Sequence, residues 1–324
     1  MFLITLSAFI LDLIIGDPEF ILHPVVIIGK LIALTEKAAR KILNNIKSIE
    51  NQKRLLEISG FLIVIINSAA AILTAYVLKR IIYIPGKTAG LIFESLLISQ
   101  MIAAKGLRQE SMKVYKALKS SESGALKAAR KQVARIVGRD TEKLSKEGVV
   151  RAAVETVAEN FSDGVTAPVL FSLAGGIYGI YFYKAVNTMD SMIGYKDEKY
   201  KEIGRCAARL DDLLNFIPSR ISAFLMLCAG CLLRLNIKNG IKVFFRDRYK
   251  QASPNSAQTE AAAAGLLGVE LAGDAYYFGK LYKKQIIGTP LREIEAEDIR
   301  RINDLVLLSG ILGFIIGGAI WYIL

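Results

Sequence analysis

Hydrophobic residues occur in long blocks along this chain of 324 residues, and polar blocks separate them. Residues 58–78 and 305–324 each supply about 20 mostly apolar positions, the length that a helix needs to cross the core of a lipid bilayer. Three further blocks are shorter or interrupted by polar residues, at 1–15, 90–104 and 221–235. A sixth block, 165–186, contains Pro168 with several glycines and tyrosines. This composition predicts a broken or re-entrant segment whose free backbone groups face protein or water.

Lysine and arginine concentrate in the polar blocks. Four such blocks are strongly basic, at residues 36–57, 105–164, 194–220 and 236–304. Because the cytoplasmic loops of membrane proteins carry an excess of these residues, we expect all four loops in the cytoplasm and the weakly basic stretch 79–88 outside. Block 165–186 should then not cross the membrane, since a full crossing would separate 194–220 from the other basic loops.

The polar blocks also have helical character. Residues 111–137 carry apolar positions at helical spacing with an interruption at 120–124, which predicts a helical hairpin. No alternating strand pattern of useful length occurs. We therefore predict an all-α, polytopic integral membrane protein of the cell membrane. Its single domain over residues 1–324 would contain about four to six membrane-embedded helices joined by helical cytoplasmic loops.

Composition and charge agree with this layout. The chain is 53% hydrophobic, which is too apolar for a protein that is soluble throughout, and its formal net charge is +12. With 26 glycines, 7 prolines and 3 cysteines, it is neither collagen-like nor a disulfide scaffold. The positive charge is explained by the basic cytoplasmic loops, so we expect a lipid bilayer and no nucleic acid as partner.

Common zinc and nucleotide motifs are missing from the sequence. The single histidine, His23, and three cysteines cannot assemble a zinc site from the usual ligands. Residues 86–88 resemble the end of a P-loop, but the motif requires glycine at the position that Ile81 occupies. A bound nucleotide would therefore be held by other groups.

The densest set of chemically useful residues lies at 151–164. Arg151, Glu155, Glu159 and Asp163 recur every four residues, so a helix would carry them as one slowly rotating stripe. Three carboxylates on one face repel one another unless a cation is present. Oxygen ligands of this kind suit Mg²⁺, which usually takes one or two carboxylates together with phosphates and water. A solvated, salt-bridged helix face would carry the same residues.

Two further polar clusters follow the interrupted apolar block. The first is at Lys184, Asn187 and Asp190, where polar groups beside an apolar segment are often functional. The second is at Arg205, Arg209, Asp211 and Asp212, which combine anion-binding arginines with adjacent carboxylates. An interfacial polar face and ordinary helix ion pairs are the simpler interpretations of the two clusters.

Turn-like segments supply the remaining candidates. Residues 253–260 precede an Ala-rich helix, which Ser256 or Thr259 is placed to cap, so that its amide end faces an anion. Residues 138–141 form a similar turn that includes Arg139, and His23 lies where an apolar run is interrupted at the expected membrane surface.

Six sequence blocks, in order and spread over nearly the whole chain, carry a family resemblance. They lie at residues 12–32, 137–144, 151–168, 183–200, 204–220 and 253–271, and include RAAVETVAENFSDGVTAP and SPNSAQTEAAAAGLLGVEL. Together they resemble the CobD/CbiB family, the adenosylcobinamide-phosphate synthases of cobalamin biosynthesis. Residues 257–260 depart from the family pattern, since they read Ala-Gln-Thr-Glu where Gly-x-Pro-Glu is usual. Lys250 or Gln251 also replaces a histidine that often precedes this block.

The resemblance implies an integral membrane ligase. In that family, ATP drives amide formation between a propionate of adenosylcobyric acid and (R)-1-amino-2-propanol phosphate, or a related amino alcohol, to give adenosylcobinamide phosphate. Mg²⁺ and ATP would be required, and other cobamide-assembly enzymes are expected partners.

The activity that the resemblance implies assigns a role to each candidate residue. The catalytic candidates are Glu155, Glu159, Asp163 and Asp190, and the metal candidates are Asp163, Asp211 and Asp212. The substrate-binding candidates are His23, Arg139, Lys184, Asn187, Arg205, Arg209, Ser253 and Asn255.

Three other functions remain open at this point. A Mg²⁺-dependent membrane prenyl or phosphate transferase is suggested by Asp211 and Asp212, but a further aspartate is needed where Asn215 and Phe216 stand. A membrane transporter is suggested by polar residues in or beside apolar blocks, at Asp12, Asn67, Glu94 and Gln100. A noncatalytic subunit that assembles other cobamide enzymes is the third.

Overall fold

The computed structural model describes residues 1–16, 23–43, 49–277 and 279–323, and most of them are helical. These residues form two compact units. Unit 1 comprises Met1–Ala103 and Ala167–Asn215, and unit 2 comprises Ala104–Thr166 and Phe216–Leu324. The predicted all-α class is confirmed. The single domain over residues 1–324 stays a prediction.

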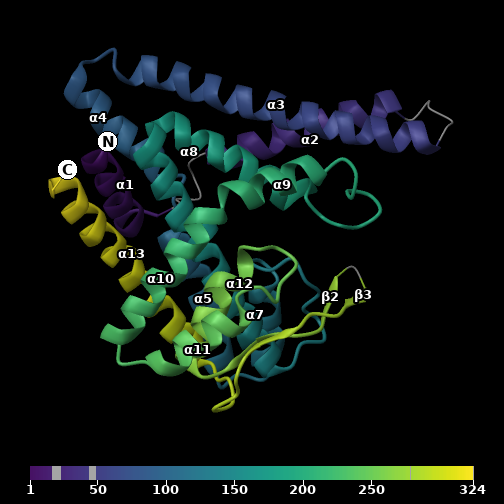
Figure 1. The fold of residues 1–324 in the computed structure, drawn as a ribbon, viewed down its shortest axis with the longest axis vertical. Helices are drawn as coiled ribbons and strands as arrows, with labels where there is room; N and C mark the ends of the chain where they lie inside the picture. The colour runs from purple at the N-terminus through teal and green to yellow at the C-terminus, as the bar shows by residue number, and fades with distance from the viewer. Residues whose placement is uncertain (17–22, 44–48, 278, 324) are drawn as a thin grey trace. The chain divides into compact units, whose positions relative to one another are not determined.

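Unit 1 is built around one long helix. Its described helices are α1 (Phe2–Ile14), α2 (Pro24–Leu43), α3 (Ile49–Ile82), α4 (Lys87–Ser99), α8 (Ala167–Ile193) and α9 (Arg205–Leu214). The 34-residue α3 packs against α2, α8 and α9 (Figure 1). A buried apolar cluster that includes Ile32, Ile63 and Met189 joins these helices. Burial of such side chains stabilises the unit by roughly 1.5–3 kcal/mol for each one.

Helix α8 is broken, as the sequence predicts for block 165–186, but the break is not at its proline. Pro168 lies in the first turn of α8, where its missing N–H is tolerated. The non-helical residue is Gly176, with φ 57° and ψ −143°. This backbone conformation is essentially restricted to glycine. The sequence therefore places the interruption correctly within the block, and the structure assigns it to Gly176.

Gly176→Ala is expected to destabilise unit 1 by roughly 1–3 kcal/mol, because a side chain is strained at this φ and ψ. Its Cβ would also lie 2.8 Å from Cε of Met1. The matched control is Gly175→Ala, since nothing lies within 4 Å of a Cβ added there. Thermal melts of both variants in detergent test this, and equal melting temperatures would contradict it.

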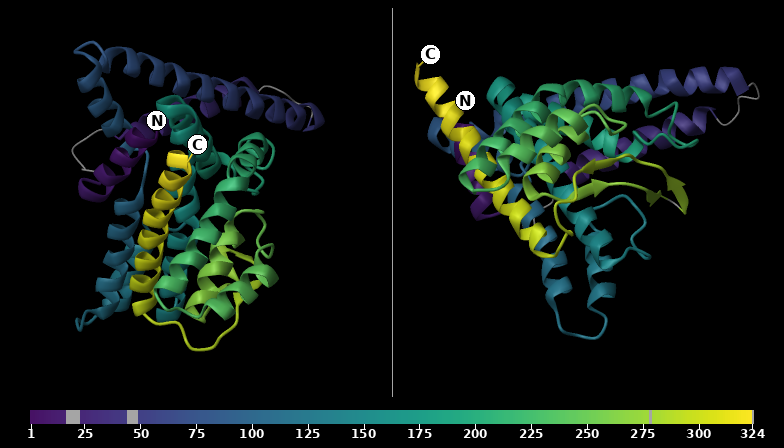
Figure 2. Two further views of the ribbon diagram at one scale, coloured as in Figure 1. Left: turned by 60° about the vertical axis from the view of Figure 1, so that its left-hand side comes forward. Right: turned by 60° about the horizontal axis from the view of Figure 1, so that its bottom comes forward.

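Unit 2 contains the remaining described helices and four short strands. The helices are α5 (Ala104–Lys119), α6 (Ala125–Val133), α7 (Lys146–Phe161), the π-helix η1 (Ser162–Thr166), α10 (Phe216–Leu232), α11 (Ile237–Asp247), α12 (Ser256–Leu267) and α13 (Glu297–Ile323). Helices α5 and α6 form the hairpin that the sequence predicts (Figure 2). Helix α12 packs against α7, α10 and α11, and every residue from Ala257 to Leu267 is buried.

The prediction of helix throughout the polar blocks is wrong for residues 270–288. Here β1 (Glu270–Ala272) pairs antiparallel with β4 (Ile286–Gly288), and β2 (Ala275–Tyr277) pairs antiparallel with β3 (Lys280–Tyr282). Each strand has three residues, which is too short for the two-residue alternation of a strand to be visible in the sequence.

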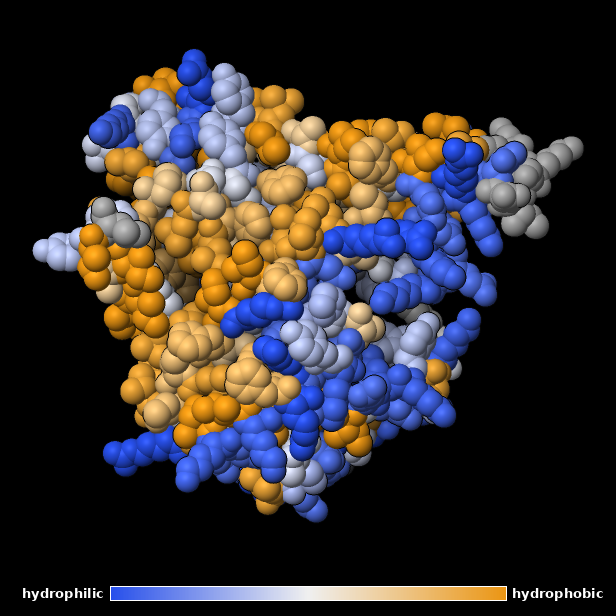
Figure 3. All heavy atoms as spheres, viewed as in Figure 1, coloured by the Kyte–Doolittle hydropathy of each residue, from blue (hydrophilic) through white to orange (hydrophobic). Residues whose placement is uncertain are grey.

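Four stretches of the described residues are long and apolar enough to cross a membrane. They are Asn51–Ile82, Lys87–Lys119, Lys146–Ile193 and Glu297–Ile323, and the bent pair α9 and α10 would make a fifth. Figure 3 shows hydrophobic side chains gathered along α3, with hydrophilic ones near its ends. Helix α1, with 13 residues, spans only about 20 Å of a hydrocarbon core about 30 Å thick. The predicted four to six membrane-embedded helices thus agree with the four or five described stretches that could span a membrane, and the path of 165–186 stays a prediction.

Candidate active site

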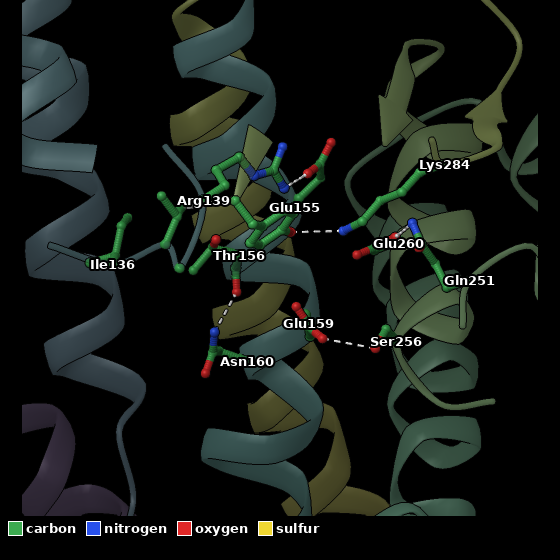
Figure 4. Close-up of a pocket in the computed structure, with 13 residues that line it drawn as sticks. Ile136, Arg139, Glu155, Thr156, Glu159, Asn160, Gln251, Ser256, Glu260 and Lys284 are labelled. Atoms are coloured by element: carbon green, nitrogen blue, oxygen red, sulfur yellow. Dashed lines mark hydrogen bonds and ion pairs between the residues drawn. The ribbon is translucent and has the colours of Figure 1, made fainter. Parts of the chain in front are cut away.

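A polar cavity of about 160 Å³ lies within unit 2. Helix α7 and helix α12 form two of its walls, and side chains from the loop after α6, the loop before α12 and the β2–β4 region complete it (Figure 4). Its ionisable lining residues are Arg139, Glu155, Glu159, Glu260, Tyr277 and Lys284. The cavity thus brings three carboxylates and two cations together.

Glu155 is held on the α7 wall by both of its carboxylate oxygens. Ser145 caps the start of α7 by accepting a hydrogen bond from the Gly148 N–H, so the helix begins well before the cavity. Arg139 forms a buried ion pair with Glu155 Oε2, and the backbone N–H of Ala272 donates to Oε1 at 2.5 Å. Because both of its oxygens accept these bonds, Glu155 holds the Arg139 side chain and the end of β1 in place.

Burial by itself would lower the pKa of Arg139, but the adjacent Glu155 carboxylate more than reverses this and raises it. Arg139 therefore remains a guanidinium cation. Its side chain is only 14% exposed and that of Glu155 4%, so the pair is shielded from solvent.

Glu159 lies one helical turn beyond Glu155 and is half-buried. The Ser256 hydroxyl donates a hydrogen bond to Glu159 Oε1 at 2.8 Å. The expectation that Ser256 or Thr259 caps α12 is wrong, since the N-cap residue is Asn255 and it makes no side-chain cap bond. Tertiary packing instead directs the Ser256 hydroxyl across to α7.

Glu260 is the third carboxylate and belongs to the buried helix α12. Gln251 Nε2 donates to Glu260 Oε2 at 3.1 Å, and the residue is 5% exposed. Burial, together with the nearby Glu159 and Glu155 carboxylates, raises the pKa of Glu260 well above its ordinary value. Lys284 and the Gln251 hydrogen bond oppose this shift without cancelling it.

Lys284 supplies the second cation of the cavity. Its ammonium group donates to the Tyr277 hydroxyl at 2.8 Å and lies 5.0 Å from the centre of the Tyr277 ring. Lys284 follows β3 and Tyr277 ends β2, so the strand segment that the sequence did not reveal places both.

The structure separates the sequence candidates into several groups. Arg139, Glu155 and Glu159 line the cavity, whereas the half-buried Asp163 lies in η1 and is not among its lining residues. Asn255, in the same unit, accepts hydrogen bonds from Ser219 at 3.2 Å and from Arg220 at 3.3 Å. Its backbone N–H donates to the hydroxyl of the half-buried Ser253 at 3.2 Å.

The other candidates belong to unit 1, where a chain of hydrogen bonds links α8 to α9. Asn187 donates to Asp211 Oδ1 at 3.2 Å, and Asn215 donates to Asp211 Oδ2 at 2.9 Å. Tyr183 in turn donates to Asn215 at 2.9 Å. The structure therefore joins two sequence clusters that are more than twenty residues apart.

The remaining unit 1 candidates are more dispersed. Lys184, Asp190 and Asp212 are half-buried. Arg209 is exposed, and Arg205 forms a surface ion pair with Glu57 at 2.6 Å. His23 immediately precedes α2, and its Nδ1 accepts a hydrogen bond from the Val25 N–H at 3.2 Å.

Seven polar lining residues were not assigned to the site from the sequence: Thr156, Asn160, Gln251, Ser256, Glu260, Tyr277 and Lys284. The sequence does mark Glu260, because it directly precedes a run of alanines and an acidic residue is unusual in a helix of that buried kind. No sequence signal marks Tyr277 or Lys284.

Metal binding by the protein alone would need several ligating side chains close together. Among the residues that the structure describes, no group of three or more His, Cys, Asp or Glu side chains could hold a metal ion.

Comparison with known proteins gives one consistent result. The cobalamin biosynthesis protein CobD of Clostridium perfringens is 45% identical over 312 residues, covering 95% of this chain and 94% of that protein. The protein of the same name from Clostridium acetobutylicum is 40% identical over 312 residues, with 95% of each chain covered. That of Geobacter metallireducens is 43% identical over 293 residues, covering 90% of this chain and 88% of the relative. No solved structure matches the chain.

The family resemblance of the six sequence blocks is confirmed. The family described as CobD/Cbib protein matches residues 5–306, which include all six of these blocks and every residue of the cavity. The chain therefore belongs to the CobD/Cbib protein family.

Proposed function

We propose that this chain acts in cobalamin biosynthesis as an ATP-dependent ligase. It would join adenosylcobyric acid to (R)-1-amino-2-propanol phosphate, or a related amino alcohol, and release adenosylcobinamide phosphate. Family membership and the names of the relatives support the role in cobalamin biosynthesis. The observation that carries the ligase chemistry is the unit 2 cavity, which combines three carboxylates with Arg139 and Lys284.

The reaction requires both activation of an acid and deprotonation of an amine. A carboxylate and an ammonium ion do not condense in water at pH 7, so the acid oxygen first attacks the terminal phosphorus of ATP, giving an acyl phosphate and ADP. The amine nitrogen then forms the C–N bond as inorganic phosphate leaves. A carboxylate that accepts the amine proton accelerates such a step by about 10²–10⁴-fold.

The cavity residues supply groups for these steps. Glu159, which is only half-buried and bonded through one oxygen, is suited to accept the proton. Lys284 provides positive charge where negative charge develops on phosphate oxygens, and Arg139, although paired with Glu155, supplies further N–H donors in this partly desolvated site. Glu155 would position Arg139, because both of its oxygens are already bonded.

Mg²⁺ is proposed to arrive with the ATP phosphates and to neutralise part of their charge. The candidate ligands are Asp163 in unit 2 and, separately, Asp211 and Asp212 in unit 1, with Asp190 of unit 1 as a further catalytic candidate. Asp211 already accepts hydrogen bonds from two asparagine amides, which hold its carboxylate in a fixed orientation.

The proposed location is the cell membrane, with the active site facing the cytoplasm. The apolar helices and the basic loops support this arrangement. Cytoplasmic ATP would then reach the site directly, and other cobamide-assembly enzymes are the proposed partners.

The test is an assay of the purified chain in detergent with ATP, Mg²⁺, adenosylcobyric acid and the amino alcohol with or without its phosphate. We expect one ADP released for each corrinoid amide detected by mass spectrometry. Asp163→Asn and Asp212→Asn should lower turnover by at least about 10²-fold if those residues serve the reaction. Glu122→Gln is the control, because Glu122 is exposed in the turn between α5 and α6.

Two outcomes would count against parts of this proposal. Absence of product with folded wild-type protein would exclude the ligase function under these conditions. Normal turnover in a folded aspartate variant would remove that residue from the site.

A further inference from the structure

The charges of the unit 2 cavity do not balance. Glu155 and Arg139 neutralise each other as a buried ion pair. The other ionisable groups facing Glu260 from neighbouring elements are Glu159 on α7, and Lys284 and Tyr277 from the strand segment. When both remaining carboxyl groups are ionised, they exceed the single positive charge of Lys284. The cavity therefore favours a cationic ligand.

Each of these two carboxyl groups keeps one oxygen for such a ligand. The Ser256 hydroxyl donates its hydrogen bond to Oε1 of Glu159, and the Gln251 amide donates to Oε2 of Glu260. Within the described parts of the chain, the second oxygen of either group has no hydrogen-bond partner. Figure 4 shows the two carboxyl groups on facing walls of the cavity, Glu159 on α7 and Glu260 on α12. Glu260 is 5% exposed, so its second oxygen belongs to a largely buried side chain that lines the cavity.

We propose that the primary ammonium group of a small amine binds between Glu159 and Glu260. This inference rests on the proposed function for the identity of the amine, a short amino alcohol or its phosphate ester. At about 30 Å³ for each water-sized group, a cavity of about 160 Å³ holds roughly five such groups, which suits a short chain. Lys284 would face the hydroxyl or phosphate end of this amine, because its positive charge attracts the oxygens there and repels the ammonium group.

An ammonium ion fits these oxygens better than a metal held by protein alone. It carries N–H donors that can each reach a single oxygen on a different wall, whereas Mg²⁺ demands near-octahedral coordination. No metal-holding group of three acidic or other ligating side chains occurs in the described residues. The Ser256 and Gln251 donors also orient each carboxylate so that its second oxygen is left for the ligand.

Binding of the amine should be coupled to release of a proton by Glu260. Burial and the neighbouring carboxylates raise the pKa of Glu260. A cation that binds beside Glu260 would lower this pKa again, so Glu260 would release its proton. Amine affinity should therefore increase as the pH rises through the titration of Glu260, and this dependence should be lost in Glu260→Gln.

The experiment is titration calorimetry of the full chain in detergent with 1-amino-2-propanol, with its phosphate, with 1,2-propanediol and with MgCl₂. We expect both amines to bind and the diol, which lacks nitrogen, to give no signal. Glu159→Gln and Glu260→Gln should each weaken amine binding by at least about 10-fold, since each loses a charged acceptor. Glu122→Gln should bind as the wild type does.

The outcomes separate this inference from the proposed function. Amine binding that requires both glutamates, without any ligation, would contradict the ligase function and leave the ammonium site standing. Ligation with an unchanged amine affinity and KM in both folded variants would overturn the ammonium site. Mg²⁺ binding that depends on the same glutamates, with no competition by the amine, would also overturn it.

Discussion

Arg139→Met is expected to destabilise the protein by about 3–5 kcal/mol, because it leaves the Glu155 carboxylate buried without its cation. Glu155 has a 4% exposed side chain and, among the residues that the structure describes, keeps only the Ala272 N–H as a hydrogen-bond donor after the change. Chemical unfolding in detergent, followed by helical circular dichroism, measures the effect.

A matched arginine on the surface provides the control. Arg205 pairs with Glu57 at 2.6 Å, but the two side chains are 51% and 43% exposed. Arg205→Met should therefore cost less than about 1 kcal/mol. Adding Glu155→Gln to Arg139→Met should restore part of the lost stability, because the unpaired charge is removed. Equal costs for the two arginine variants would show that the Arg139 pair is not structural.

Glu260→Gln is expected to become more stable than the wild type as the pH rises. A carboxyl group whose pKa is raised by folding stabilises the protein below its unfolded pKa, and this stabilisation is lost as the pH rises toward the folded pKa. Glutamine keeps a similar shape and an acceptor for Gln251 but has no proton to lose. Each pH unit between the unfolded and the folded pKa of Glu260 contributes up to about 1.4 kcal/mol, so the advantage of the variant should grow as the pH rises.

Melting curves of wild type and Glu260→Gln at pH 5, 6 and 7 test this directly. Glu122→Gln, which removes an exposed acid, should show no such trend. A constant difference between Glu260→Gln and wild type at all three pH values would contradict a raised pKa at Glu260. A variant that is more stable yet binds amine more weakly would show that the buried acid is retained for function at the expense of stability.

Local patterns in the sequence predicted a substantial part of this molecule. The apolar run 58–78 lies within α3, and the hairpin of α5 and α6 follows the interruption at 120–124. Glu155 and Glu159 line one cavity because residues four apart share a helix face. Arg151 and Asp163 belong to the same sequence stripe but are not lining residues, since the stripe rotates and α7 gives way to η1 after Phe161.

Other features depend on contacts between distant segments. The three-residue strands at 270–288 leave no periodic pattern, yet they bring Tyr277 and Lys284 to the cavity. Ser256 has the composition and position of a helix cap, but its hydroxyl binds Glu159. Asn187 and Asp211 were assigned to separate clusters, and α8 and α9 place them within hydrogen-bond distance.

The sequence by itself determined the helical class, the apolar spans, the family and the pairing of Glu155 with Glu159 on α7. These follow from residue periodicity and composition, which act within a few helical turns. Only the tertiary structure decided that Arg139 meets Glu155 and that Gly176 breaks α8. It also decided that Glu260 from a buried helix faces Glu159. Such features depend on how the elements pack, and packing joins residues that no local pattern relates, whether they are 16 positions apart, as Arg139 and Glu155 are, or as distant in sequence as Glu159 and Glu260.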